Sequence, residues 1–348
     1  MNPHDPAAPL CGVAGLATWL PEPRQTAAEI AAATGLPEPV IAEKFGIVRK
    51  PVPGPDDHPC AMGARAAERA LARAGVLPEQ VDVLLSISEE YKERPLMVSG
   101  IKLQQLVGCR NAWALDLAQR CCTTIAGLAV ARGLFASDPR IQTILLAGGY
   151  RNGDLIDYAD RDVSFMWSLA AGGGAIVLRR HDPAQGPLRN AVLGTALRSD
   201  GDFADDVYVP AGGTVEPADA AARDAGRTML RVRDAAAMKG RLAERSGANF
   251  RGAIDDALAV TGHDRADIDY LALLHMKRSA HMGTLADLGL QPEQSTYLED
   301  YGHVGQFDPI LSLELADAAG RLKDGDLCVL ASAGVSYAWG AATIRWGV

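Results

Sequence analysis

Residues 113–135, WALDLAQRCCTTIAGLAVARGLF, predict a buried strand, a polar turn with two adjacent cysteines, and a long apolar helix. A turn that joins a strand directly to a helix places its residues at the helix N-terminus. The partial positive charge there stabilises a thiolate. A cysteine in such a turn is either a small packed side chain or a nucleophile. We favour a nucleophile, because candidate acids and bases occur later in the chain.

Those candidates lie in two stretches of the C-terminal third, LLHMKRSAH at residues 273–281 and YGHVGQFDP at residues 301–309. Acyl transfer from a thioester needs a thiolate, a proton shuttle and hydrogen-bond donors for the tetrahedral oxyanion. His303 is a candidate shuttle. His275 ends an apolar segment, so a buried structural histidine is the alternative to a catalytic one.

The composition describes a globular chain. Of its residues, 48% are hydrophobic and 22% are charged. Its length of 348 residues allows two units of ordinary size or one large fused core. The formal net charge is −9, and no run of basic residues is interleaved with aromatic ones. We therefore expect no nucleic-acid partner.

Neither a targeting segment nor a membrane span is expected. The first ten residues, MNPHDPAAPL, contain no basic region followed by an apolar one, and the nearly apolar run at residues 165–178 is too short and too rich in glycine. This pattern predicts a cytoplasmic protein.

The six cysteines show no CxxC spacing, so we expect reduced thiols. A vicinal disulfide or a metal clip at Cys121 and Cys122 is the alternative. Because no further ligands stand at zinc spacing, we predict no metal.

Strands alternating with helices predict a parallel α/β sheet. Thr26 is a candidate helix cap ahead of Glu29, and Gly75 a candidate helix end. Residues 181–223 read as a polar connection between the halves, or as a surface excursion that shapes a substrate pocket. The run AAGGGAIVL at residues 170–178 allows a phosphate-binding loop, but it has neither GxGxxG nor GK[ST], so we favour close backbone packing.

The two halves of the sequence resemble each other weakly, as VLPEQVDVLLSIS at residues 76–88 and RADIDYLALLH at residues 265–275 illustrate. We predict a duplicated α/β unit, with residues 1–185 carrying the nucleophilic cysteine and residues 186–348 carrying the histidines. The active site is expected where the halves meet at the C-terminal ends of their strands.

Four motifs together resemble the thiolase-fold ketoacyl-ACP synthase III family over nearly the whole chain; they are DLAQRCC (116–122), LLH (273–275), YGH (301–303) and AGVSYAWGAATIRW (333–346). The resemblance implies two duplicated halves in a five-layered αβαβα core. It identifies Cys121, five residues after Asp116, as the nucleophile in preference to Cys122. It also places a catalytic histidine at His275.

The sequence departs from this family where Gly-Asn is expected. Gly302 is followed by His303, with Asp308 five residues on, a pattern similar to the cervimycin-type acyltransferases and related starter-unit enzymes of aromatic polyketide pathways. Those enzymes use Cys-His-Asp triads, so the resemblance implies that Asp308 orients His303. The oxyanion would be held by backbone N–H groups of Cys121 and of Val335 or Ser336.

Further roles follow from the resemblance alone. Glu93 stands where olefin- and pyrone-forming relatives place a glutamate that enters the partner subunit's pocket, although a solvated loop carboxylate is the reading we favour. Binding of the thioester donor is assigned to four basic residues, of which the last two are alternatively a solvated face: Arg49, Arg161, Lys277 and Arg278.

The function implied is acyl transfer through acyl-Cys121, from an acyl carrier protein (ACP) or coenzyme A thioester to a small-molecule or carrier acceptor in secondary metabolism. No tightly bound cofactor is expected, and the chain is predicted to form a homodimer. Two alternatives stay open. One is decarboxylative Claisen condensation with a malonyl thioester, using Cys121, His275 and His303, and the other is a non-catalytic partner subunit of a ketosynthase heterodimer.

Overall fold

A computed structural model of the protein describes residues 10–348. Residues 1–9, where we expect no targeting segment, lie outside this description. Nine strands form one mixed sheet in the order β11-β12-β13-β8-β1-β7-β6-β4-β5. Their bounds are β1 Cys11–Trp19, β4 Val83–Ser86, β5 Trp113–Asp116, β6 Thr143–Tyr150, β7 Gly172–Arg180, β8 Ala191–Ser199, β11 Tyr270–Leu273, β12 Leu327–Gly334 and β13 Ala338–Arg345.

The strand order repeats within the sheet. In the order β4-β6-β7-β1 the first pair is parallel and the next two pairs are antiparallel, and β11-β12-β13-β8 shows the same order and directions. The two sets are joined where Gly12 of β1 pairs with Ala191 of β8. This repetition is what a duplicated α/β unit predicts, while the boundary placed at residue 185 stays a prediction.

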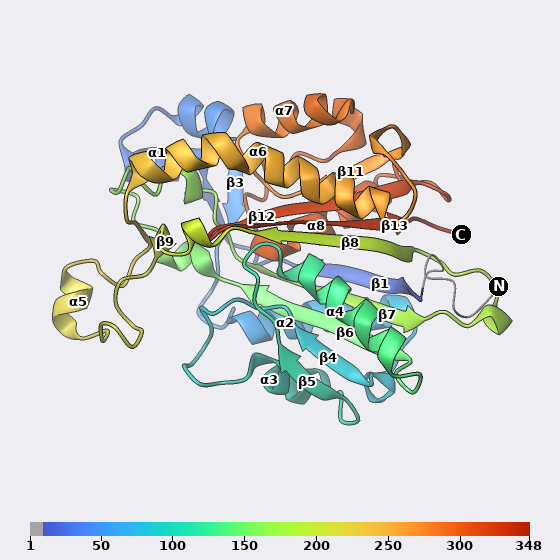
Figure 1. Cartoon of the computed structure of the whole chain (residues 1–348). Coiled ribbons are helices and arrows are strands. Elements are labelled where there is room, and N and C mark those ends of the chain that lie inside the picture. The colour runs from blue at the N-terminus through green and yellow to red at the C-terminus, as the bar shows by residue number, and fades with distance from the viewer. Residues whose placement is uncertain (1–9) are drawn as a thin grey trace.

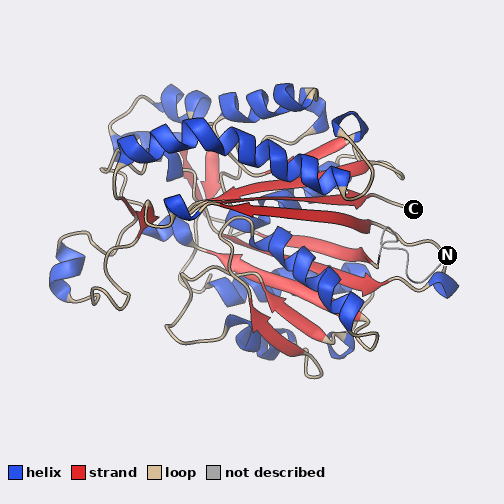
Figure 2. Cartoon of the chain, viewed as in Figure 1, coloured by secondary structure: helices blue, strands red, loops and turns tan. Residues whose placement is uncertain are grey.

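Eight α-helices surround and separate the two sets of strands: α1 Ala27–Thr34, α2 Pro59–Ala74, α3 Ser99–Val107, α4 Thr123–Ser137, α5 Ala220–Asp224, α6 Ala235–Ala259, α7 Arg278–Leu288 and α8 Asp308–Ala318. Helix α2 packs on β1, β6 and β7, and α6 packs on β8, β12 and β13. Figures 1 and 2 show these helices on the outside of the strands.

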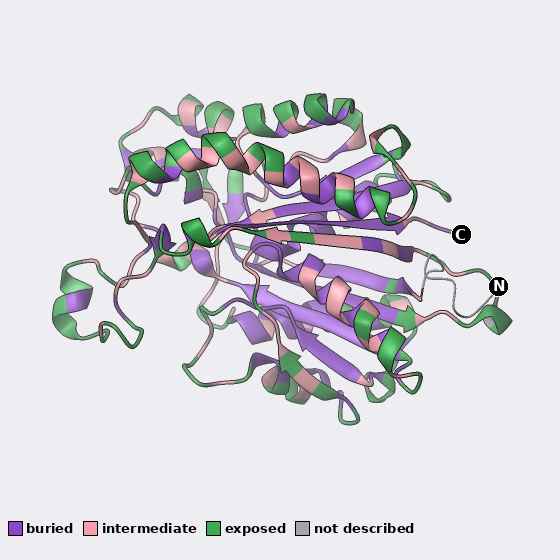
Figure 3. Cartoon of the chain, in the orientation of Figure 1, coloured by how far each residue is buried: buried purple, intermediate pink, exposed green. Residues whose placement is uncertain are grey.

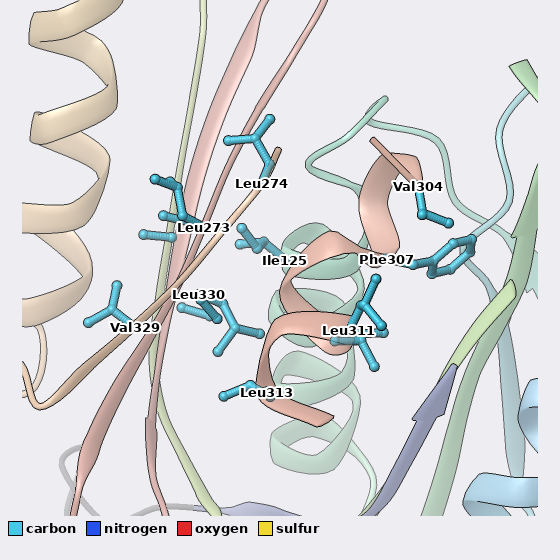
Figure 4. Close-up of a cluster of buried hydrophobic side chains, with 14 of the residues drawn as sticks. Ile125, Leu273, Leu274, Val304, Phe307, Leu311, Leu313, Val329 and Leu330 are labelled. Carbon is cyan, nitrogen blue, oxygen red and sulfur yellow. The ribbon is translucent and has the colours of Figure 1, made fainter. Parts of the chain in front are cut away.

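Helices α4 and α8 form the middle layer. Helix α4 contacts β8 and β13 of the second set, whereas α8 contacts β1 and β7 of the first set as well as β11. Between them lies a cluster of apolar side chains that includes Ile125 of α4 and Leu311 of α8 (Figure 4). The result is the predicted five-layered αβαβα arrangement, and it brings the N-termini of α4 and α8 to the same region.

Burial follows this layering, since the central strands are buried and the outer helices expose their outward faces (Figure 3). Two short ribbons lie outside the large sheet, and the connection that carries α5 projects from the body beyond one of them (Figure 1). The ribbons are β2 Arg24–Thr26 with β3 Arg49–Pro51, and β9 Val207–Tyr208 with β10 Arg231–Val232.

Several local predictions are confirmed. Thr26 and Glu29 form a capping box at α1, and Gly75 ends α2 with φ 62°. The glycine run serves close packing, because a Cβ at Gly173 would lie 2.4 Å from the carbonyl oxygen of Met62 in α2. Backbone and helix therefore approach more closely there than a side chain would allow.

Three predictions are wrong. The sheet is mixed rather than parallel, because pairs such as β6–β7 and β12–β13 are antiparallel. Strand β5 is not buried, because it is the edge strand of the sheet and leaves Trp113 48% exposed. Residues 181–223 are not only a connection, since they contain β8, which pairs with β13 along its whole length. The sequence of β8, AVLGTALRS, is not a continuous apolar run, and its middle residues are only half-buried. We therefore did not recognise it as a strand.

All six cysteines are buried and free. Among residues 10–348, no cluster of three histidine, cysteine or acidic side chains is arranged to hold a metal ion. Within the same residues, no helix is both long enough and apolar enough to cross a bilayer.

Candidate active site

A cavity of about 1090 Å³ lies against the N-terminal end of α4, and Cys121, His275 and His303 all line it. Most of its wall is apolar, with contributions from both halves of the chain and from the ribbon β9–β10. The sequence predicted these three residues as neighbours, and the fold brings them together. A large, mainly apolar cavity with a few convergent polar groups is typical of a ligand site.

Cys121 stands in a sharply bent turn between β5 and α4. The residue before it, Arg120, has φ 50°, a conformation that a residue other than glycine adopts only when its surroundings hold it. The hydroxyl of Thr123 donates to the carbonyl of Arg120 at 2.6 Å and accepts from the N–H of Gln119 at 2.8 Å. On the other side, a Cβ at Gly334 would lie 3.0 Å from the nitrogen of Cys121. The turn is thus fixed from both sides.

Cys122 faces away from the cavity. Its Sγ lies 3.3 Å from the carbonyl oxygen of Ser332 and 3.5 Å from that of Ala338, in the hairpin β12–β13. Burial raises the pKa of this thiol well above its ordinary value. A thiol so placed packs as a small buried side chain.

His303 connects Cys121 to Asp308. Its Nε2 lies 3.0 Å from the Sγ of Cys121, and its Nδ1 lies 2.5 Å from the Oδ2 of Asp308. Because a carboxylate only accepts hydrogen bonds, Nδ1 carries a proton and donates it to Asp308. The backbone of His303 is also held, since its N–H donates to Ser168 and its carbonyl accepts from Ala170.

Asp308 is the first residue of α8 and is completely buried. Besides the bond to His303, Oδ2 accepts the backbone N–H of His275 at 2.7 Å, and Oδ1 accepts that of Val304 at 2.7 Å. The two carboxylate oxygens thus accept three hydrogen bonds at a buried position.

The pKa values of His303 and Cys121 are both shifted from their ordinary values. Burial alone would lower the pKa of His303, but Asp308 and Cys121 outweigh it and raise that pKa well above its ordinary value. Burial raises the pKa of the Cys121 thiol, and His303 opposes this. His303 is therefore a stronger base than a free imidazole, and it lies within hydrogen-bond reach of the thiol.

His275 is held differently. Its Nε2 donates to the carbonyl oxygen of Gly46 at 2.9 Å, and burial lowers the pKa of the ring to about 4. The ring is neutral at physiological pH, and its buried Nδ1 has no hydrogen-bond partner among the described residues. The N–H of His275 is thus already bound, and its other ring nitrogen is an acceptor.

The turn that joins β12 to β13 lies beside Cys121. Val335 lines the cavity, and Ser336 adopts φ 81°. Since Gly334 touches the backbone of Cys121, the N–H groups of this turn and of Cys121 lie in one small region.

Two acidic residues singled out in the sequence lie away from the thiol. The carboxylate of Asp116 accepts the backbone N–H groups of Ser99 and Gly100 at the start of α3. Glu93 accepts the N–H of Cys60 in the first turn of α2 at 2.6 Å. It is therefore not the solvated carboxylate that we favoured, since helix α2 needs an acceptor at its N-terminus.

Of the four predicted donor-binding residues, only Lys277 lines the cavity. Arg49 is paired with Asp300 and Arg278 with Glu299, while Arg161 donates to the carbonyl of Thr34. Burial lowers the pKa of Lys277, and two further lysines that the sequence analysis missed, Lys44 and Lys239, lower it too. The three ammonium groups mark a positive region at the cavity.

Three polar residues of the cavity wall were also missed: Glu89, Tyr150 and Asn152. Glu89 follows β4, and the other two stand at the end of β6, the parallel neighbour of β4. Carboxyl ends of parallel strands are where such sites form, so the sequence did contain a signal.

Comparison with known proteins agrees with this fold. Two models of 3-oxoacyl-[acyl-carrier-protein] synthase III match residues 115–201 and, for its C-terminal part, residues 258–346. Beta-ketoacyl-[acyl-carrier-protein] synthase III of Rhizobium meliloti is 27% identical over 335 residues, which are 96% of this chain and 98% of that protein.

Solved structures show the same fold. The 3-oxoacyl-(acyl carrier protein) synthase III of Pseudomonas aeruginosa superposes with a TM-score of 0.83 at 23% identity, covering 97% of this chain and 99% of the other. The priming beta-ketosynthase of the R1128 polyketide pathway gives a TM-score of 0.83 at 21% identity, covering 100% and 99%. With its Cys-His pair in a thiolase-type fold, the chain belongs to the ketoacyl-ACP synthase III family.

Proposed function

We propose that the protein is an acyltransferase that carries its acyl group on Cys121. The observation that supports this most strongly is the chain of contacts from Cys121 Sγ to His303 Nε2 at 3.0 Å and from His303 Nδ1 to Asp308 Oδ2 at 2.5 Å. A nucleophile, a base and a carboxylate that orients the base are the parts that acyl transfer needs.

In the first half-reaction, His303 accepts the thiol proton and Cys121 attacks the thioester carbon of the donor. The backbone N–H groups of Cys121 and of Val335 or Ser336 hold the oxyanion. His303 then protonates the leaving thiol of the donor. Acyl-Cys121 remains, and the neutral ring of His303 is ready to accept a proton from the incoming acceptor.

Two features favour acyl transfer over condensation. Decarboxylation of a malonyl thioester needs donors that stabilise the developing enolate oxygen. The N–H of His275 is bound to Gly46, and the proton on His303 Nδ1 is bound to Asp308. Once His303 has given its Nε2 proton to the leaving thiol, neither ring keeps a free N–H group for an enolate oxygen.

Decarboxylative condensation remains the second candidate, because relatives such as that of Rhizobium meliloti are named beta-ketoacyl synthases. A non-catalytic subunit is disfavoured, since the cysteine and the histidine are in contact.

The donor is an ACP or coenzyme A thioester. An acyl carrier protein is part of the relatives' names, and OleA of Xanthomonas campestris was solved with bound lauroyl-CoA. The positive region of Lys44, Lys239 and Lys277 suits its phosphate groups, or the acidic surface of a carrier protein. The acceptor is a small molecule or a carrier in secondary metabolism.

We also propose a homodimer through the exposed edge of β5. Apolar side chains that are exposed in the single chain gather on β5, α3 and the loop before α3: Leu96, Val98, Ile101, Leu106, Trp113 and Leu115. An unpaired edge strand with apolar neighbours is suited to pairing with a second copy.

The proposal is tested by intact-mass analysis after incubation with a panel of acyl coenzyme A and acyl N-acetylcysteamine thioesters. One acyl adduct is expected on the wild type and on Cys122→Ala, and none on Cys121→Ala. An adduct on Cys121→Ala that is absent from Cys122→Ala would show that the nucleophile is misassigned.

A further inference from the structure

Two buried polar side chains on the cavity wall are joined to each other but are not fully satisfied. The Nδ2 of Asn152 donates to Oε2 of Glu89 at 2.9 Å. Oε1 of Glu89 and Oδ1 of Asn152 are both buried and have no hydrogen-bond partner among residues 10–348. Both atoms are acceptors, so two side chains that line the cavity each keep a buried oxygen without a donor in the described part of the chain.

Their place follows from the sheet. Strands β4 and β6 are parallel neighbours, and Glu89 and Asn152 follow their carboxyl ends. Arg120, which directly precedes Cys121, approaches Oε2 of Glu89 at 3.5 Å. Glu89 interacts electrostatically with both Cys121 and His303. The two oxygens therefore belong to the region where the acyl group would be attached.

A purely structural role does not account for them. Arg120 already has Glu90 as a partner at 2.7 Å, and its contact with Glu89 uses only Oε2. Burial raises the pKa of Glu89, with Arg120 opposing, so a further donor or cation near this carboxyl would stabilise its charged form.

We propose that Glu89 and Asn152 bind the acceptor, and that the acceptor is a primary amine. This inference rests on the proposed acyl transfer and names the acceptor of the same site. A hydroxyl group has one hydrogen and satisfies one of the two oxygens. An ammonium group donates to both and keeps a third hydrogen for His303.

The transfer then balances as follows. His303 Nε2 takes one proton from the bound ammonium, and the exposed lone pair attacks the carbonyl carbon of acyl-Cys121, forming the C–N bond. Glu89 takes a second proton from nitrogen along the existing hydrogen bond. The C–S bond breaks, and His303 returns its proton to Sγ. The products are an amide and the Cys121 thiol, and Glu89 releases its proton to solvent.

The test separates loading from discharge. The wild type is first loaded with the thioester of the panel that acylates Cys121 best, and is then mixed with n-butylamine or n-butanol at equal concentration. Amide and ester are measured by mass spectrometry after subtraction of the reaction of the free thioester. We expect amide in excess over ester. Starting from equal amounts of acyl-Cys121, Glu89→Gln should form amide about 10²-fold more slowly than the wild type.

Glu38→Gln is the control, because it removes an exposed carboxylate that does not line the cavity and should leave both steps unchanged. Should Glu89→Gln fail to fold, Asn152→Ser tests the same oxygen pair. Equal yields of ester and amide, or undiminished amide formation by the Glu89 variant, would overturn the inference alone. Failure of every thioester to load the wild type would overturn the proposed function and the inference with it.

Discussion

Asp308 and His303 are joined by a hydrogen bond of 2.5 Å between Oδ2 and Nδ1, and two backbone N–H groups hold the same carboxylate from His275 and Val304. The carboxylate cannot turn away without losing these donors. It therefore fixes the orientation of the imidazole and leaves Nε2 toward Cys121.

Asp308→Asn should lower the rate of acyl transfer by a factor on the order of 10² or more. An amide has one oxygen for three donors, so its NH₂ group must face either a backbone N–H or His303, where it favours the wrong tautomer. Steady-state turnover is the measurement. Asp317→Asn, on an exposed position of the same helix, is the control, and equal rates for both variants would contradict the role of Asp308.

Gly334→Ala should slow acylation of Cys121 and lower the free energy of unfolding by about 1–3 kcal/mol. The new Cβ would stand 2.7 Å from Cβ of Arg120 and 3.0 Å from the nitrogen of Cys121, so the turn must move. Gly240→Ala in α6 meets open space and should stabilise the helix by about 0.5–1 kcal/mol. If Cys121 of Gly334→Ala is acylated at the wild-type rate, the turn tolerates displacement and this prediction is wrong.

Lys50 should make stability depend on pH. It is buried, donates to the carbonyls of Trp167 and Leu169, and burial lowers its pKa to about 7. Between this value and the ordinary 10.5 of an unfolded lysine, the unfolded chain binds more protons. The free energy of unfolding, compared with Lys50→Met, should therefore rise with pH across this window, by at most about 1.4 kcal/mol per pH unit.

Urea denaturation between pH 7 and pH 9.5 measures this difference. Lys323→Met, at an exposed position, should show no such slope against the wild type. A constant difference between wild type and Lys50→Met at every pH would mean that Lys50 keeps an ordinary pKa.

Light scattering at micromolar concentration should give the mass of a dimer. Ile101→Glu, on the apolar face of α3, should give a monomer, because a carboxylate in that interface loses its hydration. Val260→Glu, equally exposed but in the other half of the chain, should stay dimeric. A monomeric wild type would exclude the interface at β5.

Much of the fold could be predicted from local signals. The cap at Thr26 and the end at Gly75 are where the sequence indicated them. The exposure of β5 and the existence of β8 could not be predicted in this way. Both depend on which strand lies at the edge of the sheet and which lies in the middle.

The site was predicted unevenly for a similar reason. Cys121, His303 and Asp308 follow motifs and come together in the structure, although their roles remain proposals. The bond from His275 to Gly46, and the burial of Glu89, depend on contacts between distant segments that no local pattern reports.

The central claim, acyl transfer without loss of carbon dioxide, is tested most directly by loading Cys121 and adding malonyl coenzyme A or malonyl-ACP labelled in the free carboxyl group. We predict that the label stays in the malonyl group and that acyl-Cys121 is discharged only by an acceptor nucleophile. Release of labelled carbon dioxide together with a β-ketoacyl product, undiminished in Asp308→Asn, would contradict the account and assign decarboxylative condensation instead.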